Sequence, residues 1–167
     1  MTSPFLDRVN QHDKWYKADD CVFCDIIAGN TGAYVVAETD MYMAFLDILP
    51  IRAGHTLVIP KAHVSHISDM SEEQSAALMH GIVRVTRAMK KAFDATGLQV
   101  AANQEYAQVV NHVHFHIVPA ISDSTSILSK WNKPPKVSIP GRRDELDEQE
   151  AVELQARLQR HMHGPKL

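Results

Sequence analysis

Short apolar runs bounded by polar or turn-forming residues occupy the N-terminal part of the chain. Residues 34–38 (YVVAE) and 41–47 (MYMAFLD) are rich in β-branched and aromatic residues, and the two polar residues between them indicate a hairpin. Residues 55–60 (HTLVIP) follow a loop that contains proline and glycine, and their own final proline is typical of a strand end. This region therefore predicts three strands.

The clearest helical periodicity lies in residues 71–96. Ser71 and Gln74 have the spacing of a capping box at its start, and Gly97 is suitably placed to cap its end. Apolar side chains recur there every three or four residues, as expected for one buried stripe: Leu78, Ile82, Val85, Met89 and Phe93. This segment predicts a long amphipathic helix.

Further elements follow the long helix. Residues 98–102 and 109–118 predict two more strands, and residues 144–162 predict a second helix with acidic residues early and basic residues late. Leu154 and Leu158 would lie on one side of that helix. A hairpin followed by a helix and further strands favours an α+β fold with a mostly antiparallel sheet.

The same pattern divides the chain into three parts. Residues 1–20 are polar and are expected to form an N-terminal arm, whereas residues 21–120 contain every predicted strand. Residues 121–167 are expected to be a C-terminal extension, in which a Ser-, Lys- and Pro-rich arm precedes the helix. A length of 167 residues fits a single folded domain with such additions.

Composition narrows the functional classes. A net charge of −3 argues against electrostatic binding of nucleic acid, and 45 % hydrophobic with 22 % charged residues is typical of a soluble globular protein. The first twenty residues lack the apolar core of a signal peptide, and no run approaches the length of a membrane span. We therefore expect no nucleic-acid or membrane partner, and a location in the cytoplasm with the nucleus as a further site.

Ten histidines are many for this length, and three of them alternate with apolar residues at positions 112, 114 and 116. On a strand their side chains would point to one side, roughly 6.6 Å apart, while the residues between them supply the core. A solvent-facing strand and a catalytic zinc site are the alternatives. Three adjacent imidazoles are hard to explain by packing, because each buried ring needs a polar partner.

Cys21 and Cys24 form a C-x-x-C motif. A redox pair would require a thioredoxin-like βαβ pattern, which the sequence lacks, and two unpaired thiols in a short apolar turn are a second alternative. Two thiolates at this spacing also suit half of a tetrahedral zinc site, which His63 or His66 could complete. The spacing does not choose between these two histidines.

Several motifs together resemble the histidine-triad (HIT) superfamily. HVHFHIVP is similar to its signature H-φ-H-φ-H-φ-φ, where φ is apolar, and CVFCDIIAG, AFLDILP, GHTLVIPKAH and QVVNHVHFH follow in the family's order over residues 21–119. The chain looks most like the Hint-like nucleoside phosphoramidases that carry C-x-x-C. The resemblance implies a HIT-like fold in residues 21–120, with a five-stranded antiparallel sheet, flanking helices and pairing into a homodimer.

The resemblance also implies roles for the histidines. His114 would attack the α-phosphorus of a nucleotide and form a covalent nucleotidyl-histidine intermediate. His116 would contact the phosphate and help to protonate the leaving group; related transferases have Gln at this position, so His favours hydrolysis. A structural zinc would be held by Cys21, Cys24, His63 and His112, with His63 preferred over His66 because it stands in the PKAH position.

The family likeness implies a nucleotide site as well. Its residues are expected to be Phe23, Ile26, Phe45, Asp47, Ile48, Asn103 and Gln108. Asp47 would accept hydrogen bonds from the ribose hydroxyls, although the apolar members could equally be ordinary core. The loop NQEYAQVV departs from the family pattern because no glycine lies between Asn103 and Gln108. Glycine would allow the backbone to approach a phosphate closely.

Together these inferences predict a hydrolase of purine nucleoside 5′-phosphoramidates, of which adenosine 5′-monophosphoramidate is the type substrate. A dinucleoside polyphosphate hydrolase is one alternative, because it shares the nucleophile and differs only in the leaving group. A nucleotide-binding regulatory module with little catalysis is the other, since the loop without glycine could impair turnover.

Overall fold

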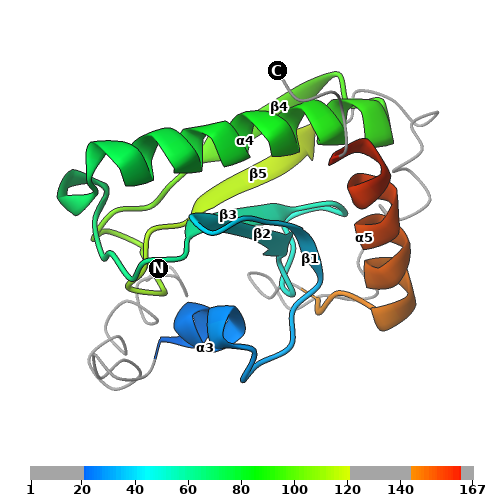
Figure 1. The fold of residues 1–167 in the computed structure, drawn as a ribbon. Coiled ribbons are helices and arrows are strands. Elements are labelled where there is room, and N and C mark those ends of the chain that lie inside the picture. The colour runs from blue at the N-terminus through cyan, green and yellow to red at the C-terminus, as the bar shows by residue number, and fades with distance from the viewer. Residues whose placement is uncertain (1–20, 121–143, 163–167) are drawn as a thin grey trace, which may run out of the picture.

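The computed structural model describes residues 21–120 and 144–162 (Figure 1). The arms expected at residues 1–20 and 121–143 lie outside the described residues. The elements in chain order are α3 (Val22–Ala28), β1 (Val35–Glu38), β2 (Tyr42–Leu46), β3 (Thr56–Pro60), the 3₁₀ turn η1 (Ile67–Asp69), α4 (Glu72–Phe93), β4 (Gly97–Ala101), β5 (Phe115–Ala120) and α5 (Glu148–Met162).

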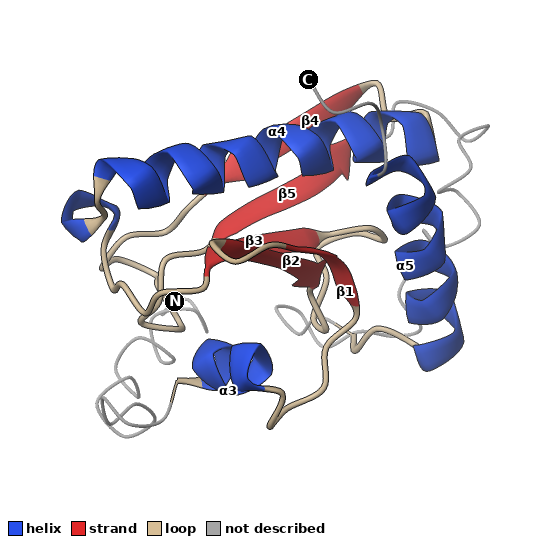
Figure 2. Ribbon diagram, in the orientation of Figure 1, coloured by secondary structure: helices blue, strands red, loops and turns tan. Residues whose placement is uncertain are grey.

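The five strands form one antiparallel sheet in the order β1-β2-β3-β5-β4 (Figure 2). Helix α4 runs along one face of this sheet, α3 lies on the other side, and α5 packs beside β1 and against α4 (Figure 1). The predicted α+β fold, with a five-stranded antiparallel sheet and flanking helices, is confirmed.

The two faces of the sheet carry separate hydrophobic cores, as the alternation of side chains along a strand requires. The larger core joins the sheet to α4 and α5, and its sheet members are Val36, Tyr42, Ala44, Leu46, Val58 and Ile117. The smaller core lies on the α3 side and contains Phe23, Met43, Phe45, Leu57, Ile59 and Val110. Any polar side chain on the α3 side of the sheet therefore lies next to this smaller hydrophobic core.

Helix α4 begins as the sequence predicts and ends earlier. The Ser71 hydroxyl accepts a hydrogen bond from the Gln74 amide at 3.2 Å, and the Gln74 side chain accepts one from the Ser71 amide at 2.9 Å, so the capping box is confirmed. The prediction that Gly97 caps the C-terminus is wrong. Asp94 takes the left-handed cap conformation with φ +51°, because aspartate tolerates this region better than most residues, and Gly97 instead starts β4.

The predicted strand at residues 109–118 begins later than expected, at Phe115. The preceding segment is bonded elsewhere: the Val113 amide donates to Val64 O at 2.7 Å and the His112 amide to Val110 O at 2.8 Å. The amides of His112 and Val113 are therefore not available for hydrogen bonds to a neighbouring strand of the sheet. His112 and His114 therefore stand in the approach to β5, and only His116 lies within the strand.

The sequence did not predict helix α3. Its seven residues are too few for a periodic pattern, and Cys21 stands at its N-cap without a side-chain capping bond. The C-x-x-C motif thus lies on a helical turn, which brings both thiols to one end of the helix.

Helix α5 begins at Glu148, four residues after the predicted start. The carboxylate of Asp147 accepts hydrogen bonds from the amides of Gln149 and Glu150, which caps the helix. Leu154 and Leu158 are fully buried on one face, as predicted. Among the described residues, every helix is too short or too polar to cross a bilayer.

Gly81 provides a test of how α4 packs on the sheet. A Cβ at this position would lie 2.8 Å from the Tyr42 ring, which is fully buried and whose hydroxyl is held by Arg84 at 2.9 Å. Alanine normally favours a helix by ~1 kcal/mol over glycine. We nevertheless expect Gly81→Ala to lower the free energy of unfolding by about 1–3 kcal/mol through overpacking, measured by urea denaturation. Gly32→Ala, where the added Cβ meets nothing within 4 Å, should leave the transition midpoint in place.

Candidate functional site

Two clusters of titratable side chains meet at the start of β5. One contains Cys21, Cys24, His63 and His112, and the other contains Asp47, His55 and His116. His114 lies between them in the chain, and its ring centroid is 5.0 Å from that of His116. The approach to β5 thus joins a thiol-rich cluster to an imidazole-rich one.

The first cluster has the geometry of a tetrahedral metal site. Its four potential ligand atoms lie within 4.8 Å of one another. Cys21 Sγ is 3.4 Å from His112 Nδ1, and Cys24 Sγ is 3.3 Å from His63 Nδ1 and 3.7 Å from His112 Nδ1. A sulfur and a nitrogen bound to one tetrahedral zinc are about 3.6 Å apart, given the usual bond lengths. The donor set and its spacing therefore fit such an ion.

A further hydrogen bond orients His112 within this cluster. His112 Nε2 donates to Pro60 O at 2.9 Å, which leaves Nδ1 unprotonated toward the thiols. Burial lowers the pKa of His112 to about 4, so this ring is neutral at pH 7. Burial also raises the pKa of Cys24 to about 11, with the neighbouring Cys21 thiol adding to the shift. A bound dication would lower the pKa of this thiol again, because it favours the thiolate.

The geometry distinguishes His63 from His66, between which the spacing of the motif could not choose. His63 lies in the cluster, with its ring centroid 5.1 Å from that of His112. His66 turns toward Asp69, whose carboxylate is 3.1 Å from His66 Nδ1. Only His63 of these two is therefore placed to be a ligand.

His114 presents one specific nitrogen. Its Nδ1 donates to the carbonyl oxygen of His112 at 2.7 Å, and because a carbonyl can only accept, Nε2 keeps its lone pair. The residue is 4 % exposed, and burial lowers its pKa. The Phe23 ring packs edge-on against it at 5.3 Å between centroids. The neutral, fixed imidazole that results can act as a nucleophile through Nε2.

His116, His55 and Asp47 form a hydrogen-bonded chain. His55 Nε2 is 3.0 Å from His116 Nδ1, and His55 Nδ1 is 3.3 Å from the Asp47 carboxylate. The amide of Ile51 also donates to His55 Nδ1 at 3.2 Å. His55 Nδ1 can thus carry a proton toward Asp47 or accept from Ile51, so either tautomer of this buried ring has partners. The arrangement can pass a proton to or from His116.

The expected nucleoside residues are only partly brought together. Phe23 and Phe45 are 6 % and 3 % exposed, with ring centroids 5.6 Å apart, and Ile26 packs against the same small core. Ile48 is instead 60 % exposed on the loop after β2. Asp47 is held at the start of that loop, where its carboxylate accepts from the Leu49 amide at 2.9 Å.

The loop of residues 103–108 keeps a left-handed backbone without glycine. Glu105 and Ala107 have φ of +53° and +60°. The Gln108 side chain spans the loop: its oxygen accepts from the Glu105 amide at 3.0 Å, and its nitrogen donates to Ser65 O at 2.8 Å. Asn103 Nδ2 donates to Ala107 O at 3.2 Å. The two amides expected to hold a phosphate thus also hold the shape of the loop.

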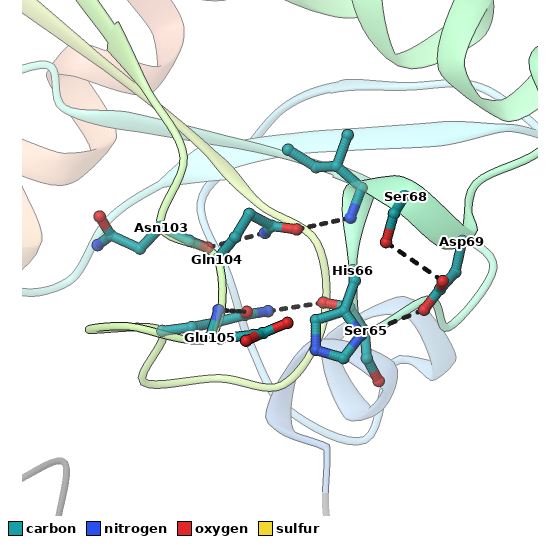
Figure 3. A network of polar contacts seen from close by, with 9 residues as sticks. Ser65, His66, Ser68, Asp69, Asn103, Gln104 and Glu105 are labelled. Carbon is teal, nitrogen blue, oxygen red and sulfur yellow. Dashed lines mark hydrogen bonds and ion pairs between the residues drawn. The ribbon is translucent and has the colours of Figure 1, made fainter.

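Two further residues belong to this site although the sequence analysis gave them no role. Gln104 accepts from the Ile67 amide at 2.6 Å and thereby ties the loop to η1 (Figure 3). His55 is 1 % exposed and completes the imidazole chain. A polar side chain directly before the buried run TLVIP is the signal that could have identified His55, because it needs a buried partner.

The loop conformation leads to a prediction about stability. Alanine at a left-handed φ costs roughly 1–2 kcal/mol, which exceeds the entropy that glycine loses on folding. Ala107→Gly should therefore raise the free energy of unfolding by about 1 kcal/mol in urea denaturation. Ala102→Gly, at the residue just before this loop and outside the left-handed region, should lower it. An equal decrease in the free energy of unfolding for both variants would contradict backbone strain at Ala107.

Comparison with known proteins identifies the family. Residues 28–122, more than half of the chain, match the HIT domain. The adenosine 5′-monophosphoramidase of Schizosaccharomyces pombe is 36 % identical over 117 residues, which are 69 % of this chain and 85 % of that protein.

Solved structures agree with this assignment. A hypothetical histidine triad nucleotide-binding protein from Sulfolobus tokodaii superposes with a TM-score of 0.70 at 30 % identity, covering 85 % of this chain and 91 % of that one. A Zn-bound histidine triad family protein from Mycobacterium smegmatis has a TM-score of 0.63 at 31 % identity, with coverages of 86 % and 96 %. The chain therefore belongs to the histidine-triad (HIT) family, a family of nucleotide-binding hydrolases.

Proposed function

We propose that the protein hydrolyses purine nucleoside 5′-phosphoramidates of the adenosine 5′-monophosphoramidate type. The observation that carries the proposal is the 2.7 Å bond from His114 Nδ1 to His112 O, which aims an unprotonated Nε2 away from the backbone. The named activity of the S. pombe relative supports the choice of substrate class.

The proposed reaction has two displacements at phosphorus. His114 Nε2 attacks the α-phosphorus, the P–N bond breaks, and the amine leaves with a proton, so that a nucleotidyl-imidazole forms. Water then attacks the same phosphorus, the bond to Nε2 breaks, and a nucleoside monophosphate is released. Because the imidazole is a better leaving group than an amine anion, the covalent intermediate divides one difficult step into two.

His116 is proposed to give the proton to the leaving amine. Its ring lies beside that of His114, and its Nδ1 faces His55 at 3.0 Å. Proton loss from the other nitrogen of His116 can be balanced by transfer along His55, whose two tautomers both have partners. Asp47 at the far end of the chain favours a positive charge on the imidazoles.

The nucleoside is proposed to lie between Asp47 and the small core on the α3 side. The Asp47 carboxylate would accept hydrogen bonds from the ribose hydroxyls, with Ile48 exposed next to it. Phe23, Ile26 and Phe45 would provide the apolar wall, while Asn103 and Gln108 hold the loop that approaches the phosphate.

Zinc is the proposed ion of the Cys21, Cys24, His63 and His112 cluster. Two thiolates and two imidazole nitrogens make a closed tetrahedral set, which leaves no position for a catalytic water. The Zn-bound relative from M. smegmatis supports this choice. The ion would be structural: it would fix His112, whose carbonyl oxygen orients His114.

A homodimer is also part of the proposal. Strand β4 is an edge of the sheet and pairs, within the described residues, only with β5. Val100 on this edge is 45 % exposed. An open edge with an apolar side chain suits pairing with a second copy.

His114→Ala tests the nucleophile. We expect its turnover of a fluorogenic adenosine phosphoramidate to fall by at least about 10³-fold, because the variant lacks the nitrogen on which the covalent intermediate would form. Mass spectrometry of wild-type protein quenched during turnover should show a nucleotidyl adduct on His114.

The matched control is His80→Ala, which removes an exposed histidine of α4 and should retain wild-type turnover. Undiminished turnover by His114→Ala would exclude the mechanism. Comparison with diadenosine tetraphosphate as substrate separates the phosphoramidase from the polyphosphate hydrolase, and binding without any turnover would indicate a regulatory module.

Cys24→Ala tests the metal. Removal of one thiolate should release the zinc, reducing the content from about one ion per chain to nearly none, and should lower the free energy of unfolding by several kcal/mol. Elemental analysis and urea denaturation measure the two effects. His66→Ala should leave the zinc content unchanged, since that ring faces Asp69; loss of zinc in His66→Ala with retention in Cys24→Ala would contradict the assignment.

A further inference from the structure

The C-terminal helix lies outside the residues that match the HIT domain, yet it is firmly part of the fold. Ala151, Leu154 and Leu158 of α5 are fully buried in the larger core. Gln155 and Gln159 both donate to Val35 O at 2.8 Å, on the edge strand beside the helix. Helix α5 is therefore a rigid support next to β1 (Figure 1).

The segment just before α5 reaches the loop that follows β2. The backbone amide of Leu146 donates to Ile48 O at 2.9 Å, and the Leu146 side chain packs at the edge of the larger core. Ile48 directly follows Asp47, the residue proposed to bind ribose. One hydrogen bond thus connects the appended helix to the proposed nucleoside site.

Asp47 is held by its own hydrogen bonds, and the Leu146 bond holds the Ile48–Leu49 peptide group next to it. The Asp47 amide donates to His55 O at 2.9 Å, and its carboxylate accepts from the Leu49 amide. These contacts position the start of the loop, whereas the Ile48 carbonyl is anchored from outside by Leu146. That peptide group also contains the Leu49 amide, so its rotation would disturb the hydrogen bond that holds the Asp47 carboxylate.

We propose that Leu146 is a positioning residue for ribose recognition: through its amide, the C-terminal segment holds the loop after β2 so that Asp47 meets the ribose hydroxyls. The inference rests on the proposed function, because it presupposes the ribose role of Asp47. It assigns a binding role to a segment that the HIT domain match does not include.

The test uses AMP and 2′,3′-dideoxy-AMP as probes in calorimetry with the full chain. We expect the wild type to prefer AMP by about tenfold, as for one or two hydrogen bonds to a charged group, and Asp47→Asn to lose most of this preference. Leu146→Pro, which removes the amide donor, should reduce the preference roughly fivefold, with little change in the affinity for the dideoxy compound.

Two controls separate the amide from other effects. Leu146→Ala keeps the amide and shortens the side chain, and Glu145→Pro places the same ring one residue earlier at an exposed position. Both should keep the wild-type preference. If Leu146→Pro also keeps it while Asp47→Asn loses it, the positioning role is overturned and the proposed function stands.

Hydrogen exchange of the unaltered protein gives an independent readout. Since coupling between two sites is reciprocal, bound AMP should slow exchange of the Leu146 amide by severalfold, without any variant that could fail to fold. An unchanged rate overturns the proposal. Equal binding of the two nucleotides by the wild type would instead overturn the ribose role of Asp47, and slowed exchange would then still support the contact between segment and site.

Discussion

The site depends on three hydrogen-bonding groups of His112 that point in different directions. Its Nε2 donates to Pro60 O at the end of β3, its Nδ1 faces the two thiols, and its carbonyl oxygen accepts from His114. A single buried residue therefore links the sheet, the proposed zinc cluster and the proposed nucleophile. Because His112 Nε2 and His114 Nδ1 each face a carbonyl oxygen, which can only accept, the tautomers of both neutral rings are determined.

The small core on the α3 side gives this linkage its rigidity. Phe23 packs edge-on against the rings of both His112 and His114, and the short helix that carries it also carries Cys24. Apolar packing and metal-ligand geometry thus act on the same elements. Displacement of α3 would therefore disturb the two thiols and the His114 ring together.

Hydrogen bonds fix the conformation of the two loops that border the site. The loop before β5 adopts left-handed conformations at Glu105 and Ala107, and the side-chain amides of Gln104 and Gln108 hold it against residues 65–67. The Leu146 amide likewise bonds to the loop after β2, through Ile48 O. In the loop of residues 103–108, these hydrogen bonds hold a left-handed backbone that glycine would adopt more readily.

Much of this could be predicted from the sequence, because local patterns carry it. The apolar stripe and capping box of α4 and the motifs of the HIT family indicated the fold, and the family resemblance led to the hypothesis that His114 is the nucleophile. Tertiary structure alone decided the rest. It started β5 at Phe115 and joined His55 to His116, and it placed His63 beside the thiols, where the spacing of the motif had left His66 equally possible, because each outcome depends on hydrogen-bond partners distant in the chain. Spacing along a chain cannot reveal a partner that only folding brings near.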